Sequence, residues 1–145
     1  MSRSISSLLV ATLAACGSGE AFQPLPFELP HGASVRITVA SGPYAAGALV
    51  PLTVSNLGDQ EYVWNPCMHA LQRPGDPEWT TVDEPERVYT ALGWILRPGG
   101  RTETTTDLPA SVPAGEYRFR FGLSRPAGDH NVTEYQVSNS FTVTP

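Results

Sequence analysis

The stretch Glu116–Ser124, EYRFRFGLS, decides how the chain is expected to fold. Apolar side chains occupy every second position of this stretch, at Tyr117, Phe119, Phe121 and Leu123. A period of two places these side chains on one face of a β-strand and the intervening residues, which include Arg118 and Arg120, on the other face. No other segment of the chain alternates over so long a run. We therefore predict that this stretch is the central strand of the domain.

The rest of the chain after residue 33 predicts further short strands separated by turns. The predicted strands are residues 34–40, 48–55, 61–65, 68–73, 78–82, 88–96, 101–108 and 133–143. Thirteen glycines and fourteen prolines disfavour helices. Turn signals at such spacing are typical of an all-β sandwich, and we predict an antiparallel sandwich of about seven to nine strands. A closed β-barrel is the alternative.

Tyr117 follows Ala114-Gly115-Glu116 at the entry to the central strand. Immunoglobulin-like sandwiches carry a tyrosine corner at the start of a late strand, where the hydroxyl bonds to the backbone a few residues upstream. A buried core aromatic is the other interpretation, and one residue can serve as both.

Composition and charge argue against a nucleic-acid partner. The formal net charge is −5, charged residues make up 16% of the chain, and all nine basic residues are arginine. A cluster of basic residues that could follow a phosphate backbone is absent from the sequence. The hydrophobic content of 41% is enough for one core.

The N-terminus has the form of a targeting segment. Arg3 supplies a positive charge, and residues 5–15 (ISSLLVATLAA) form an apolar run that ends in small residues. This run is too short to span a bilayer as a stable anchor. We predict a signal peptide at residues 1–15, a tether rich in proline and glycine at residues 16–33, and the sandwich domain at residues 34–145. Four apolar residues make the tether unusual for a linker and predict that it covers an edge of the domain: Phe22, Leu25, Phe27 and Leu29.

The apolar run closes with Leu13-Ala14-Ala15-Cys16. This motif resembles the lipobox of bacterial lipoproteins. The resemblance implies cleavage between Ala15 and Cys16, a diacylglycerol on the Cys16 thiol and an acyl chain on its amine. Gly17 takes the place of the aspartate that retains such proteins at the inner membrane. The implied location is the outer membrane facing the periplasm, or the outer face of the plasma membrane in a cell that has only one. An ordinary signal peptide with a chance cysteine is the alternative.

A second resemblance covers most of the remaining chain, in six motifs. In order they are LTVSN-G (52–58), NPCMHALQR (65–73), Trp79, L-PGG (96–100), PAGEYRFR (113–120) and VSNSFTV (137–143). Their order is similar to that in the immunoglobulin-like domains of bacterial lipoproteins and, more distantly, in the intracellular-proteinase-inhibitor-type β-sandwich. The first group implies a disulfide from the position of Cys67 to a cysteine in an R-V-C triplet. The matching triplet here is Arg87-Val88-Tyr89, which lacks that cysteine.

Cys67 is the only cysteine that remains once Cys16 is lipidated. We therefore predict a free thiol, most simply a small buried hydrophobe, with intermolecular pairing or a reactive thiol as alternatives. His69 lies two residues away, a spacing that places both on one face of a strand. A Cys-His nucleophile also needs a lowered thiol pKa and an orienting group, so no catalytic residue is predicted.

No metal or cofactor is predicted either. Carboxylates gather around one predicted hairpin, at Asp76, Glu78, Asp83, Glu84 and Glu86. Carboxylates in loops can hold Ca²⁺, but the spacing lacks the glycine and alternating ligands of a calcium loop, so a solvated acidic rim is expected. His69 and His130 could bind zinc with Cys67 only if folding brought them together.

The function predicted from these patterns is a non-enzymatic, lipid-anchored envelope protein that binds an envelope protein or a glycan. Arg118 and Arg120 are expected to pair with Glu134 or Glu103 on neighbouring strands; an alternative is that they bind an anionic partner. A protease inhibitor, acting through residues 83–87 or 125–131, and a calcium-binding envelope module are the other functions considered.

Overall fold

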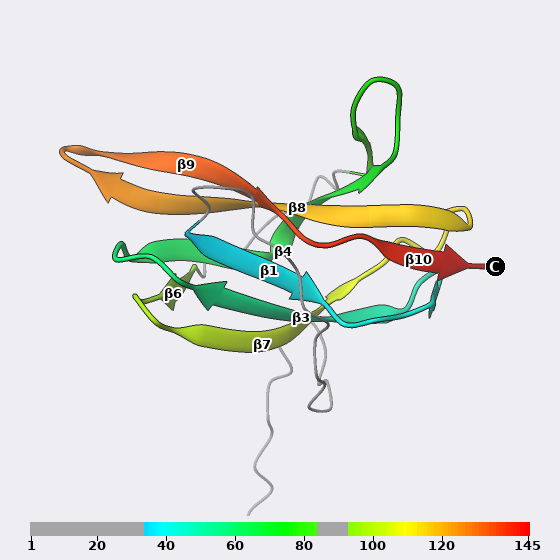
Figure 1. Ribbon diagram of the computed structural model, residues 1–145, viewed down its shortest axis with the longest axis horizontal. Helices are drawn as coiled ribbons and strands as arrows, with labels where there is room; N and C mark the ends of the chain where they lie inside the picture. The colour runs from blue at the N-terminus through cyan, green and yellow to red at the C-terminus, as the bar shows by residue number, and fades with distance from the viewer. Residues whose placement is uncertain (1–33, 84–92) are drawn as a thin grey trace, which may run out of the picture.

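The computed structural model describes residues 34–83 and 93–145. Within these two ranges the chain forms ten β-strands and no helix, and the strands lie in two sheets packed face to face (Figure 1). All strand pairs are antiparallel except β2 with β10. The predicted antiparallel β-sandwich is confirmed. The number is ten because one predicted strand is split and the two-residue β2 was not foreseen, while two predicted strands are joined in β4.

The smaller sheet has three strands in the order β1–β3–β7. Their bounds are Val35–Val39 for β1, Leu49–Asn56 for β3 and Arg101–Asp107 for β7. Pro51 lies in the central strand although proline cannot donate to a sheet ladder. The position tolerates it because β1 ends at Val39, opposite Leu52, so Pro51 lies just beyond the paired part of β1.

The larger sheet has the order β2–β10–β8–β4–β5, with β6 also paired to β4 and β9 to β8. The bounds are Tyr44–Ala45 (β2), Tyr62–Arg73 (β4), Thr80–Asp83 (β5), Trp94–Leu96 (β6), Gly115–Ala127 (β8), His130–Val137 (β9) and Phe141–Thr144 (β10). Strand β8 is flanked by β4 on one side and by β9 and β10 on the other. The predicted central strand is therefore confirmed.

Two predicted boundaries are wrong. Residues 61–65 and 68–73 belong to the single strand β4, whose register with β8 shifts between Trp64 and His69. The predicted strand at 133–143 is divided into β9 and β10 by a kink at residues 138–140. In both places polar residues or a proline interrupt the alternation of apolar and polar side chains. The segments on either side of each interruption nevertheless pair with the same strand, β8.

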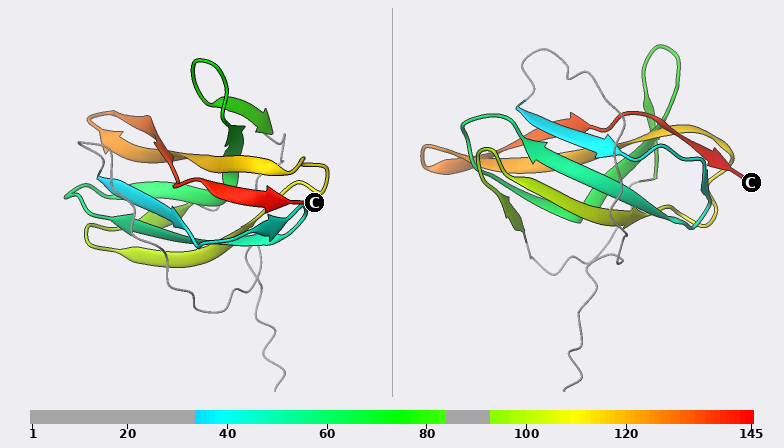
Figure 2. Two further views of the ribbon diagram at one scale, coloured as in Figure 1. Left: turned by 45° about the vertical axis from the view of Figure 1, so that its right-hand side comes forward. Right: turned by 60° about the horizontal axis from the view of Figure 1, so that its bottom comes forward.

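Residues 125–131, which lie between the predicted strands at 116–124 and 133–143, belong to the β8–β9 hairpin. The hairpin turns at Gly128 and Asp129, where Gly128 adopts a φ of 66°, a conformation that glycine reaches without steric cost. In Figure 1 and in the right view of Figure 2 the tip of this hairpin extends past the ends of the other strands. Cross-strand pairing, rather than local composition, thus decides the structure here.

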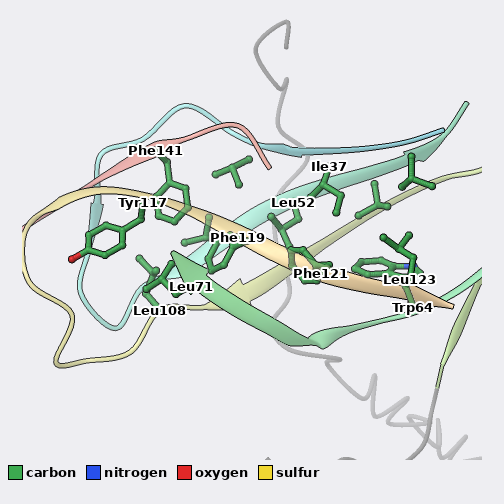
Figure 3. Packing of buried hydrophobic residues seen from close by; sticks show 14 of the residues in the cluster. Ile37, Leu52, Trp64, Leu71, Leu108, Tyr117, Phe119, Phe121, Leu123 and Phe141 are labelled. Atoms are coloured by element: carbon green, nitrogen blue, oxygen red, sulfur yellow. The ribbon is translucent and has the colours of Figure 1, made fainter. Parts of the chain in front are cut away.

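The core between the sheets is organised around the inward face of β8 (Figure 3). Phe119 and Phe121 are fully buried. A continuous series of ring contacts runs from Tyr44 to Trp94 along the larger sheet, with neighbouring centroids 5.0–6.1 Å apart; its members are Tyr44, Phe141, Phe119, Phe121, Trp64 and Trp94. Aliphatic side chains of the smaller sheet, among them Ile37 and Leu52, complete the core. Edge-to-face contacts add to the hydrophobic stabilisation of such rings.

Tyr117 forms a tyrosine corner. Its ring is 2% exposed, and its hydroxyl donates a hydrogen bond of 2.9 Å to the carbonyl of Pro113, four residues upstream. Both interpretations of this residue are confirmed, since the ring belongs to the core and the hydroxyl ties the start of β8 to the preceding turn.

Asn139 joins the two sheets at the kink between β9 and β10. Its Oδ1 accepts a hydrogen bond of 2.8 Å from the backbone N–H of Val39, and its Nδ2 donates one of 3.1 Å to the Val39 carbonyl. Next to it, Ser138 pairs with Ile37 in an isolated parallel bridge. One amide side chain therefore takes the place of a neighbouring strand at the end of β1.

Candidate functional site

The predicted lipidation site lies outside the described residues, together with the cleavage site Ala15–Cys16 and the tether. The lipobox therefore stays a prediction from the sequence. Among the described residues, none belongs to a helix long and apolar enough to cross a membrane.

Cys67 lies in the irregular part of β4, where it is half-buried. The Asn65 side chain accepts a hydrogen bond of 2.9 Å from the Cys67 backbone N–H. The structure gives Cys67 as disulfide-bonded, which corrects the prediction of a free thiol. That prediction assumed that Cys16, the chain's other cysteine, carries a lipid on its sulfur; Cys16 lies outside the described residues.

His69 is buried in the core, at 4% exposure, between the two sheets. Its Nδ1 lies 3.1 Å from the Thr106 hydroxyl of β7 and 3.3 Å from the Pro66 carbonyl. Its ring also packs edge-on against Phe119 of β8, with the centroids 5.0 Å apart. The two-residue spacing from Cys67 thus leads to no catalytic pair: Cys67 is disulfide-bonded, and His69 packs as a core aromatic that links β4 to β7.

The histidines are too far apart for a shared zinc site. His69 pairs with Phe121 of β8 and His130 with Ala127, six residues farther along that strand. At 3.3 Å per residue the separation is about 20 Å. Residues 34–83 and 93–145 contain no group of three or more histidines, cysteines or carboxylates that could hold a metal ion. Asp76, Glu78 and Asp83 lie in this range, whereas Glu84 and Glu86 lie outside it.

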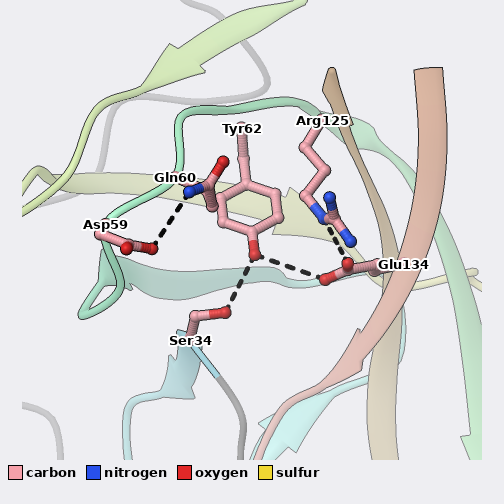
Figure 4. Close-up of polar contacts among 6 residues, drawn as sticks. All are labelled: Ser34, Asp59, Gln60, Tyr62, Arg125 and Glu134. Carbon is pink, nitrogen blue, oxygen red and sulfur yellow. Dashed lines mark hydrogen bonds and ion pairs between the residues drawn. The ribbon is translucent and has the colours of Figure 1, made fainter. Parts of the chain in front are cut away.

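The polar cluster at one end of the sandwich closes the core (Figure 4). The hydroxyl of the buried Tyr62 lies 2.9 Å from Ser34 Oγ and donates to a Glu134 carboxylate oxygen at 3.3 Å. Arg125 forms an ion pair with the same carboxylate, and this hydrogen bond raises the pKa of Arg125. In the β8–β9 hairpin Glu134 lies opposite Leu123 and Arg125 lies opposite Val132, so the ion pair is a diagonal contact between the two strands. The cluster thereby fixes the hairpin over the end of the core.

This cluster also corrects the predicted partners of the arginines on β8. Glu134 pairs with Arg125, and Glu103 pairs with Arg101 at 2.7 Å. Within the part of the chain that the structure describes, neither carboxylate forms an ion pair with Arg118. The period of two gave the face of each side chain correctly, but it could not identify the neighbour across the sheet.

The outward face of the larger sheet carries a group of five residues that we call the arginine patch: Gln72, Trp79, Arg118, Arg120 and Tyr135. The Arg118 Nε donates to Gln72 Oε1 at 2.9 Å, and its guanidinium carbon lies 4.4 Å from the centre of the Trp79 ring. The guanidinium carbon of Arg120 lies 4.8 Å from the Tyr135 ring. Two cations therefore lie side by side on β8, each on an aromatic ring.

The residues of the arginine patch differ in their exposure to solvent. Gln72 is 6% exposed, although it lies on the outward face opposite Arg118. Burial and the nearby charge of Arg120 lower the pKa of Arg118. Tyr135 packs over Gly122, where a Cβ atom would lie 3.6 Å from its ring, yet the tyrosine is 63% exposed. The sequence indicated the two arginines but not the aromatic rings, because Trp79 precedes β5 and Tyr135 lies on β9.

Of the two segments considered for protease inhibition, the structure describes one completely and the other at a single residue. Residues 125–131 form the largely exposed tip of the β8–β9 hairpin, which closes with a two-residue turn. Of residues 83–87, only Asp83 is described, as the last residue of β5.

Neither of two comparisons with known proteins finds a relative: no protein-family model matches the chain, and no curated protein has a matching sequence.

Proposed function

We propose that the protein is a lipid-anchored, non-enzymatic binding module of the cell envelope. The observation that carries the proposal is Leu13-Ala14-Ala15-Cys16 at the end of a short apolar run. Two or more acyl chains on Cys16 would hold the chain at a membrane, since each buried methylene contributes about 0.8 kcal/mol. The sandwich described above would then be presented at the membrane surface, with the arginine patch as its binding surface.

Two features of the sandwich support a binding role. Its sheets are tied together by Asn139 and by the contact between Tyr62 and Ser34, so the side chains on its outer faces are held on a fixed frame. The arginine patch then offers two cations in fixed positions. Binding surfaces built on strands keep their geometry better than surfaces built on loops.

The disulfide of Cys67 bears on the anchor. A disulfide between the two cysteines of the chain and a thioether on Cys16 would need the same sulfur atom. We propose for the envelope the form in which the Cys16 sulfur carries the lipid and is therefore not part of a disulfide.

Radioactive palmitate labelling tests the anchor. Cells that produce the wild-type chain are expected to give a labelled band, and the Cys16→Ala variant is expected to give none. A Cys67→Ala variant is the matched control, because it removes the other cysteine and should keep the label. Equal labelling of the wild type and the Cys16→Ala variant would contradict the proposal.

A further inference from the structure

We propose that the arginine patch binds carboxylated glycans, that is, polysaccharides of uronic acids. The inference rests on the proposed binding function, for which it names the ligand class. It starts from the state of Arg118, whose charge has only neutral partners in the described part of the chain: the amide of Gln72 and the indole of Trp79.

The donors of Arg118 are arranged for an anion. Its Nε is used by Gln72, and its terminal nitrogens make no hydrogen bond to any described residue. The Gln72 amide is fixed in turn, since its Nε2 donates to Thr81 Oγ1 at 3.4 Å. A guanidinium held over an indole by its Nε hydrogen bond has its two terminal nitrogens left as a fork, which matches the two oxygens of a carboxylate.

The position of the patch favours a ligand that is recognised by side chains, without hydrogen bonds to the backbone of a strand. Peptides commonly bind sheets by adding a strand to an open edge. Arg118 and Arg120 lie on β8, whose two edges are occupied by β4 and by β9 with β10. The available groups are therefore the terminal N–H fork of Arg118 and the exposed ring of Tyr135, which suit the carboxylates and the apolar faces of a sugar chain.

The negative net charge of the chain is expected to restrict the binding of an acidic glycan to the arginine patch. A formal charge of −5 repels polyanions in general. Glu116 lies two residues before Arg118 on the same strand and forms no ion pair with it in the described structure. An acidic glycan that binds at all is therefore expected to bind at the paired arginines.

The test is calorimetric titration of the full chain, purified in detergent, with polygalacturonate as the probe. The wild type is expected to bind, and the fully methyl-esterified polymer, which keeps the sugar backbone but lacks free carboxylates, is expected not to bind. Arg118→Gln is expected to weaken binding by about ten- to a hundredfold, the usual effect of losing a charge-assisted hydrogen-bonded pair. Arg118→Lys, which keeps the charge and loses the fork, should also bind at least several-fold more weakly.

Arg101→Gln is the matched control, since it removes one positive charge from an exposed arginine on the other sheet. It should leave the affinity unchanged, and all variants should keep the wild-type melting temperature. Wild-type affinity in the Arg118 variants would overturn the inference, as would equal binding of the esterified polymer. Equal or tighter binding of polyglutamate would overturn the choice of a glycan. None of these results bears on palmitate labelling, so this inference and the lipid anchor fail separately.

Discussion

Tyr117→Phe should destabilise the domain by removing one hydrogen bond and nothing else. The ring, 2% exposed, stays in place, so no cavity forms. The lost bond is the 2.9 Å contact with the Pro113 carbonyl. A net hydrogen bond contributes about 1 kcal/mol, and a buried carbonyl left without a partner costs up to about 3 kcal/mol. Because Pro113 is exposed, water can reach its carbonyl, and we expect a loss of about 1–1.5 kcal/mol.

Urea denaturation measures this loss. The midpoint should fall while the slope m stays constant, because the surface exposed on unfolding is unchanged. The melting temperature should fall by about 4–6 °C for a domain of this size. Tyr135→Phe is the matched control: it makes the same chemical change at a side chain that is 63% exposed and should stay within about 0.5 kcal/mol of the wild type. Equal stability of the two variants would refute the assignment of a tyrosine corner.

Two further substitutions test other parts of the frame. Asn139→Ala removes both hydrogen bonds to the Val39 backbone and should lower the free energy of unfolding by about 1–3 kcal/mol, as measured by urea denaturation. An unchanged midpoint would contradict the role of Asn139 as a link between the sheets. Burial raises the pKa of Tyr44, so the folded state favours the neutral phenol. The contribution of Tyr44 to the free energy of unfolding is therefore fully present below about pH 10, the pKa of an unfolded tyrosine. It is lost as the pH rises further, because the unfolded chain ionises before the folded one. Tyr44→Phe should therefore show a smaller fall in melting temperature above about pH 10 than the wild type, and parallel curves would contradict this sign.

Alternation of side chains was sufficient to predict the architecture. The apolar positions of Glu116–Ser124 are buried, and their strand is central in the larger sheet. Tyr117 could be recognised because the tyrosine corner depends on a local feature, a turn four residues upstream. A feature that depends only on neighbouring residues in the sequence can be predicted without knowing which strands pair.

Features that depend on neighbouring strands could not be predicted. Pro66 resembles a strand breaker, but β4 continues through it as an irregularity next to β8. The polar residues 125–131 resemble a loop, yet pairing across the hairpin makes them strands. Trp79 and Tyr135 could not be placed beside the arginines of β8 because the sequence does not reveal register between strands.

The measurement that tests the lipid anchor most directly is the mass of the N-terminal peptide of the chain purified from membranes. The proposed function predicts a peptide that begins at Cys16, with a diacylglycerol on its sulfur and an acyl chain on its amine. A peptide that begins at Met1, or one in which Cys16 is joined by a disulfide to Cys67, would contradict it.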